Sequence, residues 1–510
     1  MANANSSMVD FSLQVTLRYH LAFFRGLILY ICLMDVLHQH IGATELSWLD
    51  LALLIVYTLV CIGIGLWNSR KQADSDFLIA GRHLNQWGFV TSVVASYIGG
   101  AAIVAYAAYV YNFGISAIAV FGGTSLGFII FIPYARRLRH TGKEQKFYTL
   151  SDWFYHKFGK RAGALSAAIL LFVYFGMLLN QFIAGSSILA NISGLSYELS
   201  LLLSSIIIMI YLVAGGFNSV IKTDIFQYIV LFVLFIILAV ILSNRQHELI
   251  LGLTDFSSMD PAMTIAFIAF GIFIIFQSAE YWQRVYAAKS DRVVTRGLMS
   301  AAVLTLITGF AITLIGLAAH HNSPGIAPRE AFAEGLGILI SGKYLGAALV
   351  LMFAAIMSSA DTQIFVLASS VSVDWINKFS ARKLSEKRLK TVTRLSIIFF
   401  SMLGLACAWF MRDLVAVIIF ITGVGFSIIP AAIASFHMRL APTAVVISFI
   451  GGVGYVLILA IYASLQNNPF EFFKDKADLA ILSIVIATVF LFGSHLFIKF
   501  TQRSDEKIKD

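Results

Sequence analysis

Oxygen-bearing side chains lie in the middle of an apolar stretch, LVLMFAAIMSSADTQIFVLASSV, that is long enough to cross a bilayer. At about 100° per residue, one side of a helix here would carry four small or hydroxyl-bearing residues: Ala355, Ser358, Ser359 and Thr362. Asp361 would lie on an adjoining face, and an ionisable group at that depth needs a reason. Such a side could bind a small cation, although a helix contact held by serines explains the spacing equally well.

A second apolar stretch, TSVVASYIGGAAIVAYAAY, contains a place where a helix could open. Ser96 comes shortly before the paired glycines Gly99 and Gly100. An opened helix frees backbone carbonyls, which a membrane tolerates only where they line a cavity or are buried in protein. Transporters use such carbonyls to hold Na⁺ or substrate. Close packing of the glycines against a neighbouring helix is the alternative.

Further polar residues interrupt other apolar stretches. Asp224 opens a long apolar helix, where N-terminal capping accounts for a carboxylate unless the hydroxyl cluster lies nearby. Gln181 could line a pathway or bridge two helices, and Gln277 could face a substrate. Glu280 precedes Arg284 by four residues, which predicts an interface pair at helical spacing.

The composition indicates a polytopic membrane protein rather than a soluble enzyme. Hydrophobic residues make up 59% of the 510 and charged residues only 12%, about half the charged share of a soluble domain. The three cysteines have no paired spacing, and the eleven histidines have no metal-ligand spacing. No glycine-rich phosphate loop or hydrolase elbow is present. We therefore predict that the chain is not an enzyme.

From Ser47 onward, the hydropathy pattern predicts about thirteen spans of roughly 20 residues each. Their centres lie near Val56, Val104, Gly127, Leu171, Ile207, Phe232, Ile272, Ile307, Met352, Phe400, Phe420, Val456 and Val485. Residues 1–46 contain an apolar run interrupted by Arg25 and Asp35. This segment could be an interfacial helix, an extra crossing or an upstream extension, and we leave it unassigned.

The net charge of +9 comes from basic residues that gather in alternate loops. By the positive-inside rule the richer side, in which we count Arg284, is cytoplasmic. This predicts a multi-pass protein of the plasma membrane with Ser47 outside and the C-terminus in the cytoplasm. The basic residues thus indicate topology and not a nucleic-acid partner.

Four motifs occur together in one order: AGRHLNQWG, AGGFNSVIKTDIFQ, EYWQRVYAAKS and AAIMSSADTQ. With them the chain resembles the sodium:solute symporter family, which includes glucose, proline, pantothenate and sialic acid symporters. The resemblance runs from about Ser47 to about Phe500.

The resemblance implies an all-α polytopic fold with two inverted five-helix repeats, of the leucine-transporter type, and flanking helices. Residues 1–46 would be an N-terminal extension, and residues 47–84 a first flanking helix with a cytoplasmic loop. The two repeats would cover residues 85–243 and 244–440. Residues 441–510 would form C-terminal flanking helices with a short cytoplasmic tail. The first helix of each repeat would be discontinuous, around Ser96 to Gly100 and around Gly271 to Gln277, and would cradle the substrate.

The family pattern also implies the sites. A first Na⁺ site would use three backbone carbonyls and two hydroxyls: Ala95, Ile98, Ala355, Ser358 and Ser359. A second site, found in only some members, would use four side chains: Ser358, Asp361, Thr362 and Asp224. Substrate contacts would come from Ser96, Tyr97, Gly99, Gly100, Gln181 and Gln277. Proline carriers have an acidic residue at the position of Tyr97, so proline is not favoured.

These features predict a secondary active transporter that couples inward Na⁺ movement to uptake of a small polar organic solute by alternating access. Its partners would be Na⁺, the solute and the lipid bilayer, and it would work as a monomer. One alternative is a transporter-like membrane receptor, which turnover in liposomes would exclude. Another is coupling to H⁺ through Asp361, which uptake driven by a pH gradient without Na⁺ would support.

Overall fold

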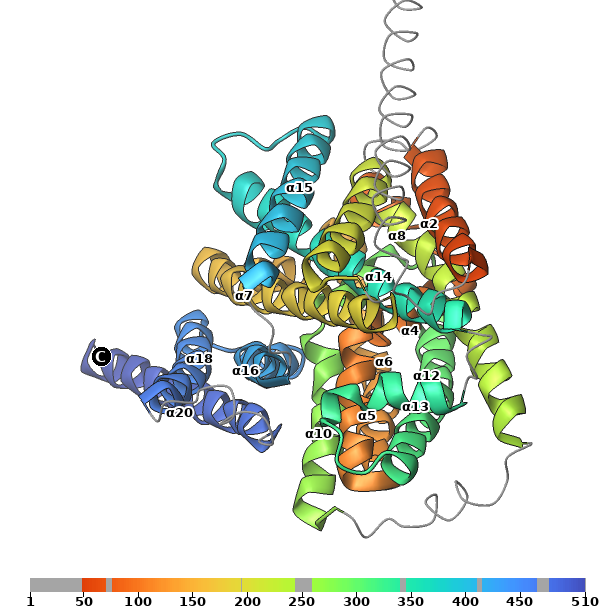
Figure 1. The fold of residues 1–510 in the computed structure, drawn as a ribbon. Coiled ribbons are helices and arrows are strands. Elements are labelled where there is room, and N and C mark those ends of the chain that lie inside the picture. Colours follow the sequence, from red (N-terminus) through yellow and green to blue (C-terminus); the bar gives the residue numbers. More distant parts are fainter. Residues whose placement is uncertain are drawn as a thin grey trace, which may run out of the picture.

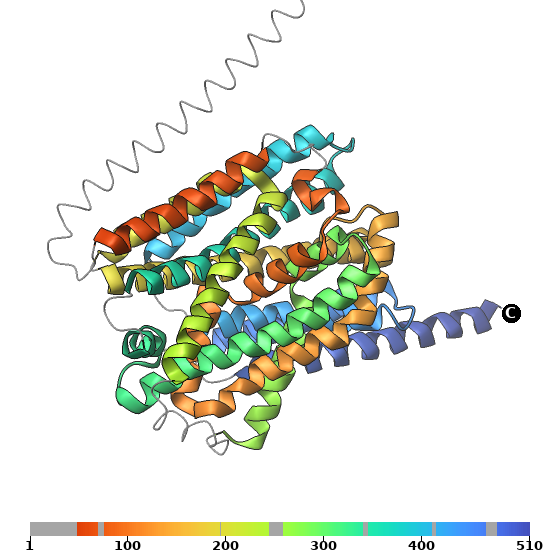
Figure 2. The ribbon, with the colours of Figure 1, turned by 90° about the vertical axis from the view of Figure 1, so that its right-hand side faces the viewer.

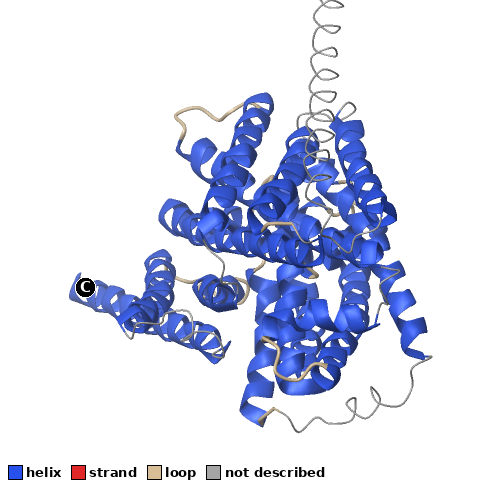
Figure 3. Cartoon of the chain, viewed as in Figure 1, coloured by secondary structure: helices blue, strands red, loops and turns tan. Residues whose placement is uncertain are grey.

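The computed structural model describes residues 48–69, 76–193, 195–243, 259–339, 345–410, 415–465 and 477–509. Within these ranges the regular structure is helical, apart from one isolated bridge between Leu84 and Ala288 (Figure 3). The prediction of an all-α fold is confirmed for this part of the chain. The unassigned segment 1–46 lies outside the described residues.

The helices follow one another along the whole chain (Figure 1). The first half contains α2 (Trp48–Ser69), α3 (Asp76–Ile79), α4 (Gln86–Tyr97), α5 (Gly100–Phe113), α6 (Ala119–Glu144), α7 (Leu150–Ser193) and α8 (Tyr197–Ser243). The second half contains α10 (Pro261–Gln277), α11 (Ala279–Ala287), α12 (Asp291–Asn322), α13 (Ala331–Leu339), α14 (Leu345–Ser369), α15 (Glu386–Phe410), α16 (Val415–Phe426), α17 (Ile429–Ala434), α18 (Pro442–Leu465) and α20 (Ala477–Lys509).

Eight helices in the described ranges are long and apolar enough to cross a membrane, or nine if the bent pair α10–α11 is one span. Three shorter apolar helices accompany them, at Ala52–Gly65, Tyr197–Ile210 and Ile418–Ala434. Each of the thirteen predicted centres falls within one of the helices. The count of about thirteen spans itself stays a prediction.

The second predicted span is broken at its middle. Ile98 (φ −88°, ψ 61°) and Gly99 (φ −79°, ψ 156°) leave the helical conformation, so α4 ends at Tyr97 and α5 begins at Gly100. Small residues are needed here because α14 is very close: a Cβ atom on Gly100 would lie 2.1 Å from Ile356 Cγ1. The helix therefore opens where the sequence indicated.

The other predicted broken span bends by 50° between α10 and α11. The break falls at Ser278, one residue beyond the predicted window of Gly271 to Gln277. Local side chains bind carbonyls near the bend: Ser278 Oγ donates to Ile274 O at 2.8 Å, and Trp282 Nε1 donates to Phe276 O at 3.1 Å.

The two broken spans are joined at one end. Leu84 N–H, just before α4, donates to Ala287 O at 3.0 Å, and Lys289 N–H, just after α11, donates to Leu84 O at 3.0 Å. The start of α4 and the end of α11 thus lie side by side.

The helix α14 forms the centre of the bundle. The most apolar stretch of this helix is 100% buried inside the protein, whereas that of α20 is 17% buried. It packs against α2, α4, α5, α7, α8 and α15, while α20 lies at the edge of the bundle in both ribbon views (Figures 1 and 2). The serines of α14 are therefore placed where neighbouring helices can supply further ligands and lipid cannot reach them.

Candidate cation site

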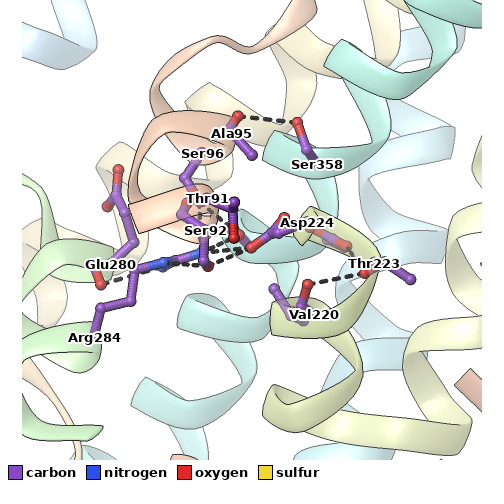
Figure 4. Close-up of polar contacts among 12 residues, drawn as sticks. Thr91, Ser92, Ala95, Ser96, Val220, Thr223, Asp224, Glu280, Arg284 and Ser358 are labelled. Carbon is purple, nitrogen blue, oxygen red and sulfur yellow. Dashed lines mark hydrogen bonds and ion pairs between the residues drawn. The ribbon is translucent and has the colours of Figure 1, made fainter. Parts of the chain in front are cut away.

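Oxygen atoms of α4 and α14 converge beside the break at Ile98 and Gly99 (Figure 4). The Ser358 hydroxyl lies 3.0 Å from both Ala95 O and Ala355 O. The neighbouring Ser359 hydroxyl donates to Ser96 O at 3.1 Å. Both serines are buried, so these contacts form away from solvent.

The backbone at the break supports this cluster. The Ile98 N–H donates to Val94 O at 3.1 Å, but the next residue has left the helix, which directs the following carbonyls out of the helical ladder. A Cβ atom on Gly99 would lie 2.4 Å from Ser359 Oγ. Glycine at this position therefore lets the opened backbone approach α14.

The structure places all five predicted ligands of the first site at the broken end of α4 or on the part of α14 that contacts it. Ala95, Ala355 and Ser358 meet through hydrogen bonds, Ser359 reaches the same helix end, and Ile98 forms the break itself. Carbonyl and hydroxyl oxygens freed at a broken helix are the ligands with which membrane transporters coordinate Na⁺. The donor set fits such an ion.

The residues of the predicted second site are buried but are not gathered around a common point by their hydrogen bonds. Asp361 Oδ2 accepts from the Thr223 hydroxyl at 3.3 Å. Asp224 Oδ2 accepts from the Ser92 hydroxyl at 2.5 Å, and the Thr362 hydroxyl lies 3.3 Å from Ser96 Oγ.

The structure places Arg284 differently from the sequence-based prediction. We grouped it with the cytoplasmic loop charges, but its side chain is fully buried (0% exposed) and its Nη2 lies 3.1 Å from Asp224 Oδ2. It also does not pair with the Glu280 carboxylate as predicted: it donates to the backbone carbonyl of Glu280 at 3.2 Å. The Glu280 carboxylate accepts instead from the Tyr174 hydroxyl.

The sequence carried one weak signal of this arrangement. Ser92 and Ser96 are four residues apart, hence on one face of α4, and both hydroxyls accept hydrogen bonds from Arg284, at 2.6 and 2.5 Å. A pair of serines on an apolar helix indicates a polar partner. The sequence does not predict that this partner is an arginine from another helix.

The expected substrate contacts divide into two groups. Gln181, on α7, lies beside the broken α4–α5 span, because its Nε2 is 2.7 Å from where a Cβ atom of Gly99 would be. Gln277 ends α10, and its buried amide faces Gly425 of α16 without a hydrogen bond to any described residue.

Other expected contacts are already engaged within the protein. The Tyr97 hydroxyl is hydrogen-bonded to Thr124 at 2.7 Å on α6. The Ser96 hydroxyl donates to Ser92 O at 2.8 Å. Gly100 lies against Ile356. Among these expected contacts, Gln277 is buried and its amide makes no hydrogen bond with a described residue, so it could bind a ligand.

Comparisons with known proteins identify the family and the fold of this chain. The model of the sodium:solute symporter family matches residues 77–438. A sodium/proline symporter of Staphylococcus aureus is 25% identical over 74% of this chain and 78% of its own length. The osmoregulated proline transporter OpuE of Bacillus subtilis is 24% identical over 68% of this chain and 75% of its own length.

Two solved structures share the fold. A substrate-bound, outward-open Na⁺-coupled sialic acid symporter gives a TM-score of 0.73 at 18% identity, covering 87% of this chain and 96% of that one. Mhp1, a nucleobase-cation-symport-1 family transporter, gives a TM-score of 0.51 at 12% identity, covering 82% of this chain and 95% of that one.

Proposed function

This chain belongs to the sodium:solute symporter family, and from that premise we propose that it couples inward Na⁺ movement to uptake of a small polar organic solute by alternating access. It is a multi-pass membrane transporter and not an enzyme, with Na⁺ as its coupling ion. The observation that carries the proposal is the Ser358 hydroxyl, 3.0 Å from a carbonyl of the broken helix and from one of α14.

Na⁺ would be held by the carbonyls of Ala95, Ile98 and Ala355 and by the hydroxyls of Ser358 and Ser359. Without an ion, the Ser358 proton lies between two carbonyl oxygens, which it can satisfy only one at a time. A bound cation would turn the oxygen lone pairs of both helices toward one centre. Ion binding would thus join α4 to α14 and favour one conformation of the pair.

The solute would contact the broken spans. Gln277 supports this proposal, since its buried amide has both a donor and an acceptor free of described hydrogen bonds. Gly99 would face the solute from the other broken span, and Gln181 from α7 beside it. The named relatives carry proline, but this chain has Tyr97 where proline carriers have an acidic residue, so we propose a solute other than proline.

The same proposal includes the overall layout. Two inverted five-helix repeats would form the transport unit, in about thirteen spans, with the C-terminus in the cytoplasm and the protein in the plasma membrane as a monomer. Alternate basic loops support this orientation.

Uptake into proteoliposomes, across a panel of amino acids, sugars, vitamins and short acids, tests the proposal. Each solute should be offered with and without a Na⁺ gradient. Solute-specific uptake that requires Na⁺ is expected, and uptake that follows a pH gradient and ignores Na⁺ would contradict it.

The Ser359→Ala variant tests the ion site. A hydrogen bond to a charged group contributes about 1.5–3 kcal/mol, so losing one oxygen ligand should raise the half-saturating Na⁺ concentration roughly ten-fold or more. Ser448→Ala is the matched control, because its buried hydroxyl also donates to a carbonyl of another helix, Ala487 O at 2.8 Å, but in the C-terminal pair α18 and α20. Equal Na⁺ dependence in the two variants would remove Ser359 from the site.

A further inference from the structure

The Glu280 carboxylate is buried beside the break between α10 and α11. Glu280 is 8% exposed and lies in the first turn of α11, directly after the break at Ser278. The Tyr174 hydroxyl from α7 donates to this carboxylate and accepts from the Glu280 backbone N–H at 3.4 Å. Tyr174 is itself buried, so the two contacts hold the carboxylate in one place between α7 and α11.

No basic residue in the described part of the chain forms an ion pair with this carboxylate. Arg284, one turn later, donates to the main-chain carbonyl of Glu280 at 3.2 Å, while its Nη2 pairs with Asp224. Figure 4 shows the Glu280 carboxylate turned away from the Arg284 guanidinium. A buried carboxylate is costly unless a positive charge and hydrogen bonds compensate it. Among the described residues, Glu280 has the hydrogen bond and lacks the ion pair.

The face of α7 that carries Tyr174 connects the two broken spans. Gln181 lies on the same face, two turns or about 10 Å further along the helix, and its Nε2 is beside Gly99 at the break of α4–α5. Met177 lies between the two and is only partly buried, although it points away from the side of Phe172, which is 46% exposed. This face of α7 therefore borders a space inside the bundle, between the two breaks.

We propose that the Glu280 carboxylate binds a positively charged amino group of the solute in this space, and that Tyr174 positions the carboxylate. The proposal rests on the proposed function and names its solute class: amines, including amino acids, in preference to sugars and short acids. An ammonium group supplies both the charge and the hydrogen-bond donors that Glu280 lacks. The buried Gln277 amide, which has no hydrogen bond with a described residue, offers a donor and an acceptor to the rest of the solute.

Pairs of solutes in which a hydroxyl replaces the amino group test this assignment. The probes are the standard primary amino acids, each with its 2-hydroxy acid, ethanolamine with ethylene glycol, and glucosamine with glucose. Thermal unfolding of the purified full-length protein in saturating Na⁺ measures their binding. An amine that stabilises the protein is expected to bind about ten-fold or more tightly than its hydroxyl counterpart, because the hydrogen bond joins two charged groups. Equal stabilisation within the pairs, or stabilisation by none of the amines, would overturn the proposal.

The Glu280→Gln variant removes the charge and keeps the size of the side chain. It is expected to weaken amine binding about ten-fold or more, to the level of the hydroxyl counterpart, with the half-saturating Na⁺ concentration unchanged. Glu334→Gln on α13 is the matched control, because its carboxylate also accepts from a hydroxyl, Ser323 Oγ at 2.7 Å, but is exposed. A retained preference for amines in folded Glu280→Gln, or a change in Na⁺ requirement alone, would overturn the proposal.

The Tyr174→Phe variant tests the positioning role. Without its hydrogen bond the carboxylate is less well held, so amine binding should weaken by about five-fold while binding of the hydroxyl counterpart stays the same. An equal loss for both members of a pair would show that Tyr174 supports the fold and not the carboxylate.

Uptake into proteoliposomes separates this inference from the proposed coupling. Na⁺-driven uptake of a sugar or short acid but of no amine would overturn the assignment of Glu280 and leave the coupling standing. Amine binding and uptake that ignore Na⁺ would contradict the coupling and leave the assignment standing. If Glu280→Gln does not fold, the preference of the wild-type protein within the pairs decides.

Discussion

Gly99 shows how one missing side chain shapes the proposed ion site. Its backbone is extended (φ −79°), a conformation that alanine also adopts, so the requirement for glycine is steric. A methyl group would lie 2.4 Å from Ser359 Oγ, 2.8 Å from Ser359 Cβ and 2.7 Å from Gln181 Nε2. The Ser359 Cβ atom is next to the backbone of α14, so it cannot simply rotate away.

We therefore expect Gly99→Ala to weaken Na⁺ binding. Overpacking costs about 1–3 kcal/mol; if this cost falls on the ion-bound state, the half-saturating Na⁺ concentration rises by about 5-fold to about 160-fold. Na⁺-dependent uptake and Na⁺ binding to the purified protein both measure it. Gly122→Ala on α6 is the control, since nothing lies within 4 Å of its added methyl. Wild-type Na⁺ affinity in Gly99→Ala would mean that α14 moves away from the added methyl group without an energetic cost.

Residue patterns single out the side chains of the proposed first site, but not their surroundings. Ser358 and Ser359 could be singled out because hydroxyls are out of place in an apolar span, and Gly99 because a glycine pair weakens a helix. Arg284 could not, because an arginine shortly after an apolar segment has the pattern of a cytoplasmic charge. Only the packing of α8 and α14 around α11 shows that it is buried beside Asp224.

At the scale of elements, glycine kinks divide the long helices. Gly216 in α8 (φ 59°, ψ −155°) and Gly159 in α7 (φ 78°, ψ −170°) have nearly the same backbone conformation, one that is essentially restricted to glycine. Their surroundings differ. A Cβ atom on Gly216 would lie 2.5 Å from Phe77 Cδ2, whereas nothing lies within 4 Å of one on Gly159.

We expect Gly159→Ala to destabilise the protein by about 1–3 kcal/mol through backbone strain alone. Gly216→Ala should add a packing cost of about 1–3 kcal/mol, because the methyl group displaces Phe77 between α3 and α8. Thermal unfolding of the two variants in the same detergent compares them directly. Equal losses would show that Phe77 moves aside at no cost and that only the kink matters.

The positions of the helices could be predicted from composition, but the breaks and contacts that connect them could not. The apolar runs placed all thirteen expected centres in helices, since 20-residue runs leave few alternatives. The break at Ser278 lacked a glycine or proline signal, and its exact position depends on hydrogen bonds from Ser278 and Trp282. The contact between Leu84 and Ala288 joins segments about two hundred residues apart, which local patterns do not encode.

For the whole molecule, burial falls from the centre to the edge. The most apolar stretch of α14 is 100% buried, whereas those of α18 and α20 are 33% and 17% buried. Exposed apolar side chains on these edge helices, such as Ile458, Ile461 and Val489, suit a lipid surface. Asp224 and Arg284 pair in the buried interior, where Ser96 contacts both Arg284 and Ser359 of the proposed ion site.

The number of Na⁺ ions per cycle would set how strongly a membrane potential drives the proposed transport. Moving one charge through 100 mV releases about 2.3 kcal/mol, which is about a 50-fold change in concentration ratio, whereas two charges give about 2,400-fold. For a solute without net charge and the proposed first Na⁺ site alone, we expect the accumulation ratio in proteoliposomes to rise about 50-fold when the interior is made 100 mV more negative at a fixed Na⁺ gradient. Potentials set by a K⁺ gradient with valinomycin allow this measurement over a range, with liposomes lacking a Na⁺ gradient and potential as the baseline. A slope near the two-charge value would show that a second ion crosses with the first.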